Sequence, residues 1–417
     1  MSSSASPRIA SVGAGLGGVA CARGLQLHGR SITVFEQEQS PTARTQGGTL
    51  DLHADTGQVA LRAAGLFEKF RALARPEGQE MRALDPITAE LLHHEQPDED
   101  YAPEIDRGQL RELFLESLAP GTIHWGQAVE SVDPLPDGTA RLRFRDGSTQ
   151  QFDLVIGADG AWSRVRQALS ADIPTHTGTT LVETFLDDAD IRHPALAHLV
   201  GNGTIIAKSG HTMLSAQRNS GGHIRVYAGL EIPHDWYVTA GLELDDTAAV
   251  REYLLTVLDG WHDSLLDLLR CSDGGFVNRP LFILPVGHTW NHLPGCTLLG
   301  DAAHLMPPFG IGANLAMLDG IDLAAAIATH PTSTRRSART NRSCSPAPPR
   351  PPKPAPTWTR RSPPATRSTS TRFANNSTNV SSRQPRIDPH NRRRHARVTP
   401  PGKGCGGPIP LRAWRRR

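Results

Sequence analysis

The chain has 417 residues, which is long enough for two or three domains with a sizeable core. Its formal net charge of +2 is unevenly divided. The last 87 residues hold 21 Lys and Arg residues and a single acid, which leaves 23 basic and 41 acidic groups, a net charge of −18, in the first 330. We therefore treat the sequence as an acidic globular body followed by a basic tail.

Several classes of protein are excluded by the composition. The five cysteines show no CxxC pair and no metal-ligand spacing, so we expect neither a disulfide framework nor a metal site, and a reducing cytoplasm as the location. The N-terminus lacks the charged and apolar regions of a signal peptide. No run of eighteen or more apolar residues exists, so no membrane span is expected.

The first motif follows a short apolar strand that we predict over Arg8–Val12. Gly13, Gly15 and Gly18 fit the pattern G-x-G-x-x-G and open a helix predicted over Val19–Leu27. In this pattern the first glycine allows a tight turn, the second lets the backbone approach a pyrophosphate, and the third lets the helix pack against its strand. The N-terminus of the helix also favours the negative charge of a phosphate.

A second apolar strand, predicted over Ser31–Phe35, ends in Glu36. Glu36 lies eighteen residues after Gly18, close to the spacing of a carboxylate that binds ribose hydroxyls. An acid here, in place of a nearby arginine, favours an adenosine ribose without a 2′-phosphate. The glycine pattern alone is also compatible with an ordinary Gly-rich turn, but the strand, helix and acid together favour a dinucleotide site.

Two further predicted strands also end in an acid beside small residues. Gln150–Ile156 leads into a turn with Asp159, which we expect to be followed by a helix, and Cys296–Leu299 leads to Asp301. Ligands of parallel sheets bind at the carboxyl ends of the strands. We therefore predict that these two acids and Glu36 bind one long, hydroxyl-rich cofactor.

These motifs resemble those of the class A FAD-dependent aromatic hydroxylases, a family of flavoprotein monooxygenases. The resemblance covers residues 7–330 and rests on the glycine pattern, on GADGAWSRVR at 157–166 and on GDAAHLMPPFGIGAN at 300–314. Within this family the chain resembles the tetracycline-inactivating branch through ARTQGGTLDLH at 43–53 and EIDRGQLR at 104–111. The resemblance implies an α/β fold, with a Rossmann-like FAD-binding domain of the GR2 type and an inserted antiparallel-sheet substrate domain.

The resemblance also implies roles for individual residues. Asp301 would accept a hydrogen bond from the ribityl chain of FAD, and Pro308 would shape the wall beside the isoalloxazine. Arg107 would contact the FAD phosphates or ribose, and Asp51 would contact the cofactor. Arg44 matches the family position that binds NADPH. Three residues at a helix start would offer backbone N–H groups to the pyrimidine edge of the flavin: Gly312, Ala313 and Asn314.

As implied by the resemblance, the enzyme needs no catalytic side chain. NADPH or NADH would reduce FAD, O₂ would form a flavin C4a-hydroperoxide, and an aromatic or polycyclic, tetracycline-like small molecule would be hydroxylated. As aligned, Asp188 and Arg225 replace Gln and His of the tetracycline branch, so we expect a related substrate instead of tetracycline itself. We expect a monomer with no membrane or specific nucleic-acid partner.

We predict the FAD-binding domain over residues 7–175 and 277–330, and the substrate domain over 176–276. Alternating strands separated by turn residues, and apolar residues at helical spacing over Thr247–Cys271, predict a sheet with one helix behind it.

The tail, residues 331–417, is rich in Arg, Pro, Ser and Thr and has no hydrophobic period, so we expect disorder. Forty Arg against four Lys residues indicate a GC-rich gene, and a frameshift is the favoured origin of the tail. Two alternatives to the monooxygenase follow: a C-terminally damaged FAD-binding protein with little or uncoupled activity, and another flavoprotein oxidoreductase.

Overall fold

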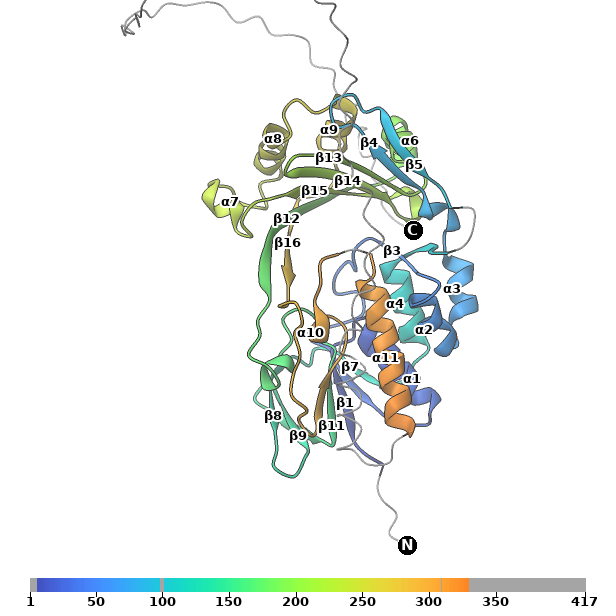
Figure 1. The fold of residues 1–417 in the computed structure, drawn as a ribbon, viewed down its shortest axis with the longest axis vertical. Helices are drawn as coiled ribbons and strands as arrows, with labels where there is room; N and C mark the ends of the chain where they lie inside the picture. Colours follow the sequence, from blue (N-terminus) through green and yellow to red (C-terminus); the bar gives the residue numbers. More distant parts are fainter. Residues whose placement is uncertain (1–5, 98–100, 309, 330–417) are drawn as a thin grey trace, which may run out of the picture. The chain divides into compact units, whose positions relative to one another are not determined.

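The computed structural model describes residues 6–97, 101–308 and 310–329 (Figure 1). The predicted disorder and frameshift concern residues 331–417, which lie outside the described residues. The described part of the chain contains two large sheets, each with its own helices, and two smaller sheets.

A five-stranded parallel sheet has the strand order β17-β11-β1-β2-β7. Its strands are β1 (Ile9–Val12), β2 (Thr33–Phe35), β7 (Ile123–His124), β11 (Leu154–Gly157) and β17 (Cys296–Leu298). Parallel strands bring their carboxyl ends to one edge of the sheet, and Glu36, Asp159 and Asp301 follow the ends of β2, β11 and β17 there. The predicted α/β fold with a Rossmann-like sheet is confirmed.

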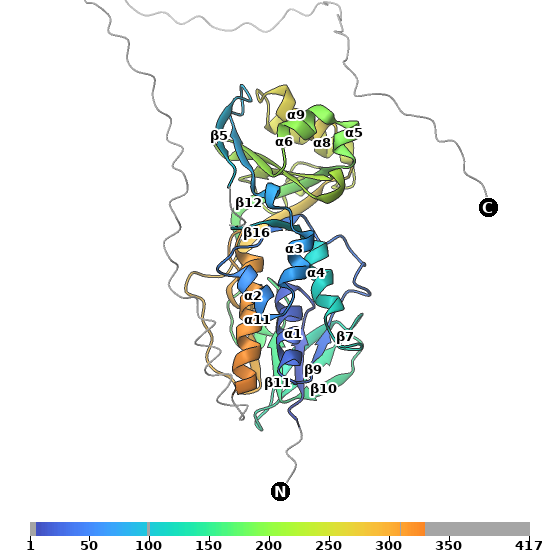
Figure 2. The same cartoon turned by 90° about the vertical axis from the view of Figure 1, so that its right-hand side faces the viewer.

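Helices cover one face of this sheet, and α1 and α11 lie side by side (Figure 2). The helices are α1 (Leu16–Leu27), α2 (Gly57–Ala63), α3 (Phe67–Leu73), α4 (Arg107–Glu116) and α11 (Gly312–Thr329). The backbones of α1 and α11 are in contact, because a Cβ atom at Gly320 would lie 2.5 Å from the carbonyl oxygen of Gly17. α1 begins three residues earlier than predicted, so Gly18 lies inside the helix.

A small antiparallel sheet covers the other face. Its strands are β8 (Val129–Pro134), β9 (Ala140–Phe144) and β10 (Thr149–Phe152). Phe35 of β2 packs edge-to-face on Phe144 with 4.9 Å between ring centroids. The prediction of one strand over Gln150–Ile156 is wrong, because β10 and β11 belong to different sheets. The chain turns at Asp153, whose N–H and carboxylate both bond the backbone of Arg8, at 2.9 and 2.7 Å.

The second large sheet has seven strands in the order β16-β12-β15-β14-β13-β4-β5. They are β4 (Met81–Leu84), β5 (Leu91–Glu95), β12 (Thr175–Leu186), β13 (Thr204–Ser209), β14 (Thr212–Arg218), β15 (Ile224–Leu230) and β16 (Val277–Ile283). All neighbours are antiparallel except β13 and β4. The sheet therefore takes β4, β5 and β16 from outside the span 176–276, which no sequence pattern indicated.

Helices pack on one face of the seven-stranded sheet: α5 (Ala189–Arg192), α6 (Pro194–Val200), α8 (Thr247–Val257) and α9 (Asp263–Arg270). A short helix, α7 (Trp236–Thr239), follows β15. The single helix predicted over Thr247–Cys271 is wrong, because Gly260 adopts φ +81° and separates α8 from α9. These four helices lie on one side of the sheet (Figure 1), and because side chains alternate along each strand, every second side chain points to the other, helix-free face.

A two-stranded ribbon of β3 (Thr49–Asp51) and β6 (Glu104–Asp106) is joined to the seven-stranded sheet by polar groups. Glu104 is buried and accepts a hydrogen bond from Thr49 Oγ1 at 2.5 Å. Arg75 donates to Thr49 Oγ1 at 3.0 Å and to the backbone oxygen of Arg218, on β14, at 3.2 Å. Burial raises the pKa of Glu104 to about 7, and its hydrogen bond with Thr49 opposes this shift.

We expect Glu104→Gln to remove a pH dependence of stability. The native state binds more protons than the unfolded chain between the ordinary pKa and about 7, so wild-type stability decreases as the pH rises through this window. The shift from 4.5 to about 7 corresponds to at most roughly 3 kcal/mol. Relative to wild type, the variant should therefore gain about 1–3 kcal/mol of unfolding free energy between pH 5 and pH 8.

Denaturant unfolding of the full chain at the two pH values measures this gain. Glu112→Gln, at an exposed position of α4, serves as the control and should show no such gain. If the difference in unfolding free energy between Glu104→Gln and wild type were the same at pH 5 and pH 8, it would contradict the raised pKa of Glu104.

Candidate cofactor-binding site

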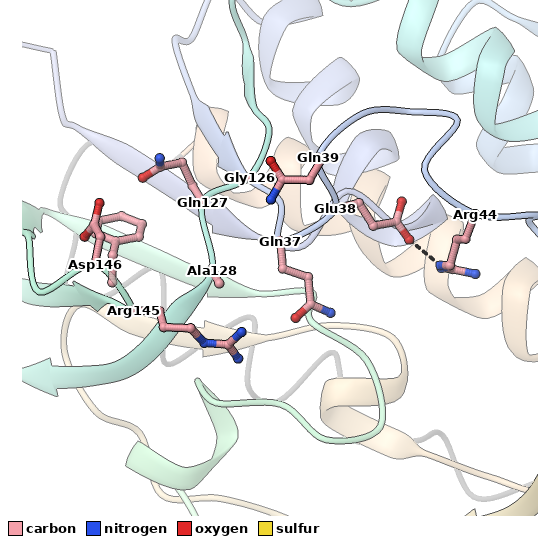
Figure 3. Close-up of a pocket in the computed structure, with 10 residues that line it drawn as sticks. Gln37, Glu38, Gln39, Arg44, Gly126, Gln127, Ala128, Arg145 and Asp146 are labelled. Carbon is pink, nitrogen blue, oxygen red and sulfur yellow. Dashed lines mark hydrogen bonds and ion pairs between the residues drawn. The ribbon is translucent and has the colours of Figure 1, made fainter.

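A cavity of about 420 Å³ opens at the carboxyl edge of the parallel sheet. Six of the predicted cofactor residues line it: Gly13, Gly15, Glu36, Arg44, Arg107 and Asp159. A second cavity of about 580 Å³ shares part of this lining, and Figure 3 shows its glutamine side chains with Arg44 and Arg145. The structure thus brings residues from five separate segments of the chain to one site.

The three glycines of the first motif differ in what surrounds them. A Cβ atom at Gly13, which has φ +100°, would lie 2.4 Å from the carbonyl oxygen of Ala158, and one at Gly18 would lie 2.1 Å from the oxygen of Gly13. A Cβ at Gly15 would meet nothing within 4 Å. The start of α1 therefore faces open space beside Gly15, which fits the predicted approach of a pyrophosphate.

Glu36 is buried and braces the glycine turn. Its carboxylate accepts hydrogen bonds from the backbone N–H groups of Ala14 at 2.7 Å and Glu38 at 3.0 Å. These two donors hold the carboxylate at the cavity wall, where its remaining lone pairs suit ribose hydroxyls.

Arg111 and Glu38 are site residues that sequence reasoning missed. Arg111 is buried and donates to the backbone oxygens of Ala14 at 3.0 Å and Pro41 at 3.2 Å, and to the Glu38 carboxylate at 3.1 Å. Glu38 also pairs with Arg44 (Figure 3), and the side chain of Arg44 is 63% exposed. The available signal was the position of Arg111, one helical turn after Arg107.

The Asp159 side chain forms hydrogen bonds within the turn that contains it. Its carboxylate accepts from Ser163 Oγ at 2.5 Å and from the backbone N–H of Arg164 at 2.7 Å. Burial raises the pKa of Asp159, and these hydrogen bonds oppose that effect. The prediction of a helix after Asp159 is wrong, because the chain there forms turns and only a three-residue 3₁₀ segment, Arg166–Ala168.

Arg166 joins the turn that contains Asp159 to the segment that contains Asp301. Its guanidinium is buried and donates to the backbone oxygens of Ala161 and, at 3.1 Å, of Ala302. Ala161 lies in the turn after β11, and Ala302 lies in the short helical segment after the neighbouring strand β17, so Arg166 holds the two segments together.

Asp301 begins the short helix α10 (Asp301–His304) directly after β17. The turn is held by Asp319 of α11, which accepts from the N–H of Gly300 at 2.9 Å and pairs with His304 at 2.5 Å. The Asp301 side chain itself is exposed. Burial lowers the pKa of Arg107, and the nearby charge of Asp301 opposes this shift, so the two predicted cofactor residues are neighbours.

Asn314 connects the start of α11 to β3. Its side chain is fully buried, donates to the oxygen of Asp51 at 2.8 Å and accepts from the N–H of His53 at 3.0 Å. Asp51 bonds His53 through its carboxylate at 2.8 Å. A Cβ at Gly312 would meet nothing within 4 Å, so this helix start also faces open space.

The remaining predicted residues lie on either side of that helix start. Ala313 packs against the core beneath α1 and α11, and Pro308 is exposed in the segment between α10 and α11. In the described ranges, no group of three or more His, Cys, Asp and Glu residues is placed to hold a metal ion. None of the described helices combines the length and hydropathy needed to cross a membrane.

Comparison with known proteins agrees with this geometry. Residues 8–232 and 295–343 match the FAD binding domain family. The monooxygenase asqM of Emericella nidulans is 32% identical over 368 residues, which cover 76% of this chain and 83% of asqM. Two solved structures share the fold: HpxO of Klebsiella pneumoniae with FAD and uric acid (TM-score 0.68, 19% identity, 81% and 84% coverage) and tetracycline destructase Tet(51) (TM-score 0.61, 21% identity, 82% and 87% coverage).

A parallel sheet with an open glycine-rich helix start, a buried acid at the cavity wall and an arginine-lined cavity is typical of a dinucleotide-binding protein. The chain belongs to the class A FAD-dependent monooxygenases, and its cofactor is FAD. The resemblance found in its sequence motifs is thereby confirmed.

We expect alanine substitutions in the glycine motif to have two different effects. Gly18→Ala forces a Cβ against the backbone of Gly13 and should destabilise the fold by several kcal/mol, whereas Gly15→Ala should leave the apoprotein's stability within about 1 kcal/mol of wild type. Gly15→Ala should still lower FAD affinity at least tenfold, because its methyl group enters the space next to the phosphates.

Thermal unfolding of the apoproteins and FAD titration by fluorescence quenching separate the two effects. If Gly15→Ala bound FAD as tightly as wild type, the pyrophosphate would not lie beside Gly15.

Proposed function

We propose that this enzyme uses NADPH or NADH and O₂ to hydroxylate an aromatic or polycyclic small molecule. One reduced nicotinamide, one proton, O₂ and the substrate give the oxidised nicotinamide, one water and the hydroxylated product. The observation that carries the proposal is the convergence of Gly15, Glu36, Arg107 and Asp301 at one edge of the parallel sheet.

The residues at this edge would divide the work of holding FAD. The open start of α1 at Gly15 would receive the pyrophosphate, and Glu36 would accept from the adenosine ribose. Burial disfavours the charged form of Arg107, and an anionic phosphate would stabilise this form. Asp301, exposed after β17, would accept from the ribityl hydroxyls.

FAD supplies the electron transfer and the activation of O₂ when it is bound. The chain's own residues would bind and orient FAD and shield it from water. The first N–H groups of α11, at Gly312, have no partner within the helix and carry a partial positive charge, which suit an electron-rich ring edge. Asn314 and Asp51 hold that helix start against β3, so its donors are fixed in place.

Arg44 would receive the nicotinamide nucleotide. Its side chain is exposed at the rim shared by the two cavities, and its only described ion pair is with Glu38, which Arg111 also holds. An exposed arginine of this kind can contact a transient phosphate without altering the buried site.

The substrate would bind between the flavin end of the site and the helix-free face of the seven-stranded sheet. Arg225 is engaged with Glu183 on that face, and Asp188 lies exposed with φ +48° before α5. Asp188 and Arg225 differ in charge or hydrogen bonding from the Gln and His of the tetracycline-inactivating branch. This difference supports an aromatic or polycyclic substrate other than tetracycline.

The direct test uses the full chain, purified and checked for yellow colour and flavin content. With a hydroxyaromatic panel, NADPH oxidation and O₂ uptake should occur in equal amounts, and the product should gain one oxygen atom from ¹⁸O₂. NADPH oxidation that yields only hydrogen peroxide with every compound would contradict hydroxylation.

Asp301→Ala should weaken FAD retention by about tenfold or more, since one charge-assisted hydrogen bond to the ribityl chain is lost. Asp133→Ala, which removes an exposed carboxylate paired with Arg143 on the same domain, is the matched control. Flavin content after dialysis measures retention. Equal flavin content in the two variants would contradict the role of Asp301.

Arg44→Ala should slow the bleaching of FAD by NADPH about tenfold while flavin content stays near that of wild type. Arg143→Ala removes an arginine of similar exposure from a single ion pair and should leave the rate unchanged. Anaerobic stopped-flow absorbance measures the rate. An unchanged rate in Arg44→Ala would exclude Arg44 from the nucleotide site.

A further inference from the structure

The side chains of Asp51 and His53 form a pair beside the start of α11. His53 Nε2 lies 2.8 Å from Asp51 Oδ2, and the two side chains are 20% and 35% exposed, respectively. A Cβ atom at Gly310, two residues before α11, would lie 3.0 Å from Asp51 Oδ2. The carboxylate of the pair therefore lies directly against the segment that leads into this helix.

The position of this segment does not depend on the imidazole of His53. The backbone N–H of His53 donates to Asn314 Oδ1 at 3.0 Å, and its carbonyl oxygen accepts from the N–H of Gln58, in the first turn of α2, at 3.0 Å. The backbone oxygen of Asp51 accepts from Asn314 Nδ2 at 2.8 Å. Since these bonds fix the backbone, bracing it does not account for the contact between the two side chains.

Three carboxylates lie near His53: those of Asp51, Asp55 and Glu104. Glu104 is opposite Asp51 in the β3–β6 ribbon. The hydrogen bond with Asp51 raises the pKa of His53, burial opposes this rise, and the charges of the three acids add to it. While His53 is protonated the Asp51–His53 pair has no net charge, and after His53 loses its proton the pair has a net charge of −1.

The neighbouring elements contribute uncharged side chains to this surrounding. Gln58 of α2 donates to the backbone oxygen of Leu52 at 2.9 Å, and Asn314 of α11 is also an amide. The ring of Tyr101 lies with its centroid 5.9 Å from that of His53. Burial raises the pKa of Glu104 to about 7, so His53 and Glu104 are the two titrating groups that an experiment must separate.

We propose that His53, by neutralising Asp51 beside the flavin ring, raises the reduction potential of bound FAD. Two electrons and one proton convert FAD into its anionic reduced form, and a nearby carboxylate without a cation opposes that added charge. Protonated His53 removes this opposition and so favours the reduced cofactor. His53 is thus a positioning residue that acts through Asp51. The inference rests on the placement of FAD in the proposed function.

The test measures the reduction potential of the FAD-loaded full chain without substrate, from about pH 5.5 to about pH 9. His53→Gln keeps an N–H donor for Asp51 but binds no proton. At the acidic end its potential should be lower than that of wild type by about 30 mV, which corresponds to roughly tenfold weaker binding of reduced relative to oxidised FAD. The difference should disappear as the pH rises through the pKa of His53, because the wild-type pair then also has a net negative charge.

Asp51→Asn should change the potential in the opposite direction. At the alkaline end the variant lacks the negative charge of the wild-type pair, so its potential should be higher by a similar roughly tenfold shift in relative binding. Thermal unfolding and flavin content show whether each variant is folded and loaded. If His53→Gln fails to retain FAD, the sign of the Asp51→Asn shift decides for or against the inference.

Two further variants serve as controls. His223→Gln removes a matched histidine, which pairs with Asp187 at 2.6 Å and is 24% exposed but lies directly before β15 in the seven-stranded sheet, and it should leave the potential unchanged. Glu104→Gln removes the second titrating group. In this background His53→Gln should still lower the potential at the acidic end and not at the alkaline end.

The possible results separate this inference from the proposed function. An unchanged potential in His53→Gln at the acidic end, a decrease that persists at the alkaline end, or no increase in Asp51→Asn would overturn the inference. Hydroxylation of an aromatic compound together with unchanged potentials in both variants would keep the function and reject the role of His53. The expected potentials without hydroxylation of any compound would support the role of His53 and reject the function.

Discussion

The cofactor edge depends on backbone contacts that only glycine allows. Gly18 packs on the carbonyl oxygen of Gly13, Gly13 packs on that of Ala158, and Gly320 packs on that of Gly17. These contacts set α1 against β1, the end of β11 and α11. Because α11 carries Asp319, they also position the turn before Asp301. The positions of the acids along this edge therefore depend on glycines elsewhere in the chain, whose lack of a side chain allows these close contacts.

Local patterns were sufficient to predict most of this edge. The glycine spacing, the apolar strands and the acids that end them are all read within about twenty residues of sequence, and the topology of a parallel sheet brings them together. Errors arose where the decisive contact is distant or small. Asp153 separates β10 from β11 through Arg8, far away in the chain, and one left-handed glycine at 260 divides α8 from α9.

The parts that the sequence did not reveal are mostly polar contacts between segments far apart. Arg111 reaches Ala14, Arg166 reaches Ala302, and Glu183 reaches Arg279. The sequence does not distinguish a buried arginine from a solvated one, and no hydrophobic period indicates these residues. The membership of β4 and β5 in the seven-stranded sheet is equally hidden, since the hairpin joins the sheet through β4, whose partner β13 lies more than a hundred residues later.

Polar groups around Arg75 and Glu104 join the β3–β6 ribbon to the seven-stranded sheet. Arg75 bonds both the β3–β6 ribbon and β14, and Asp106 accepts from the N–H of Ser220 at 3.3 Å. Each such bond contributes only about 1 kcal/mol, so this junction can rearrange at modest cost.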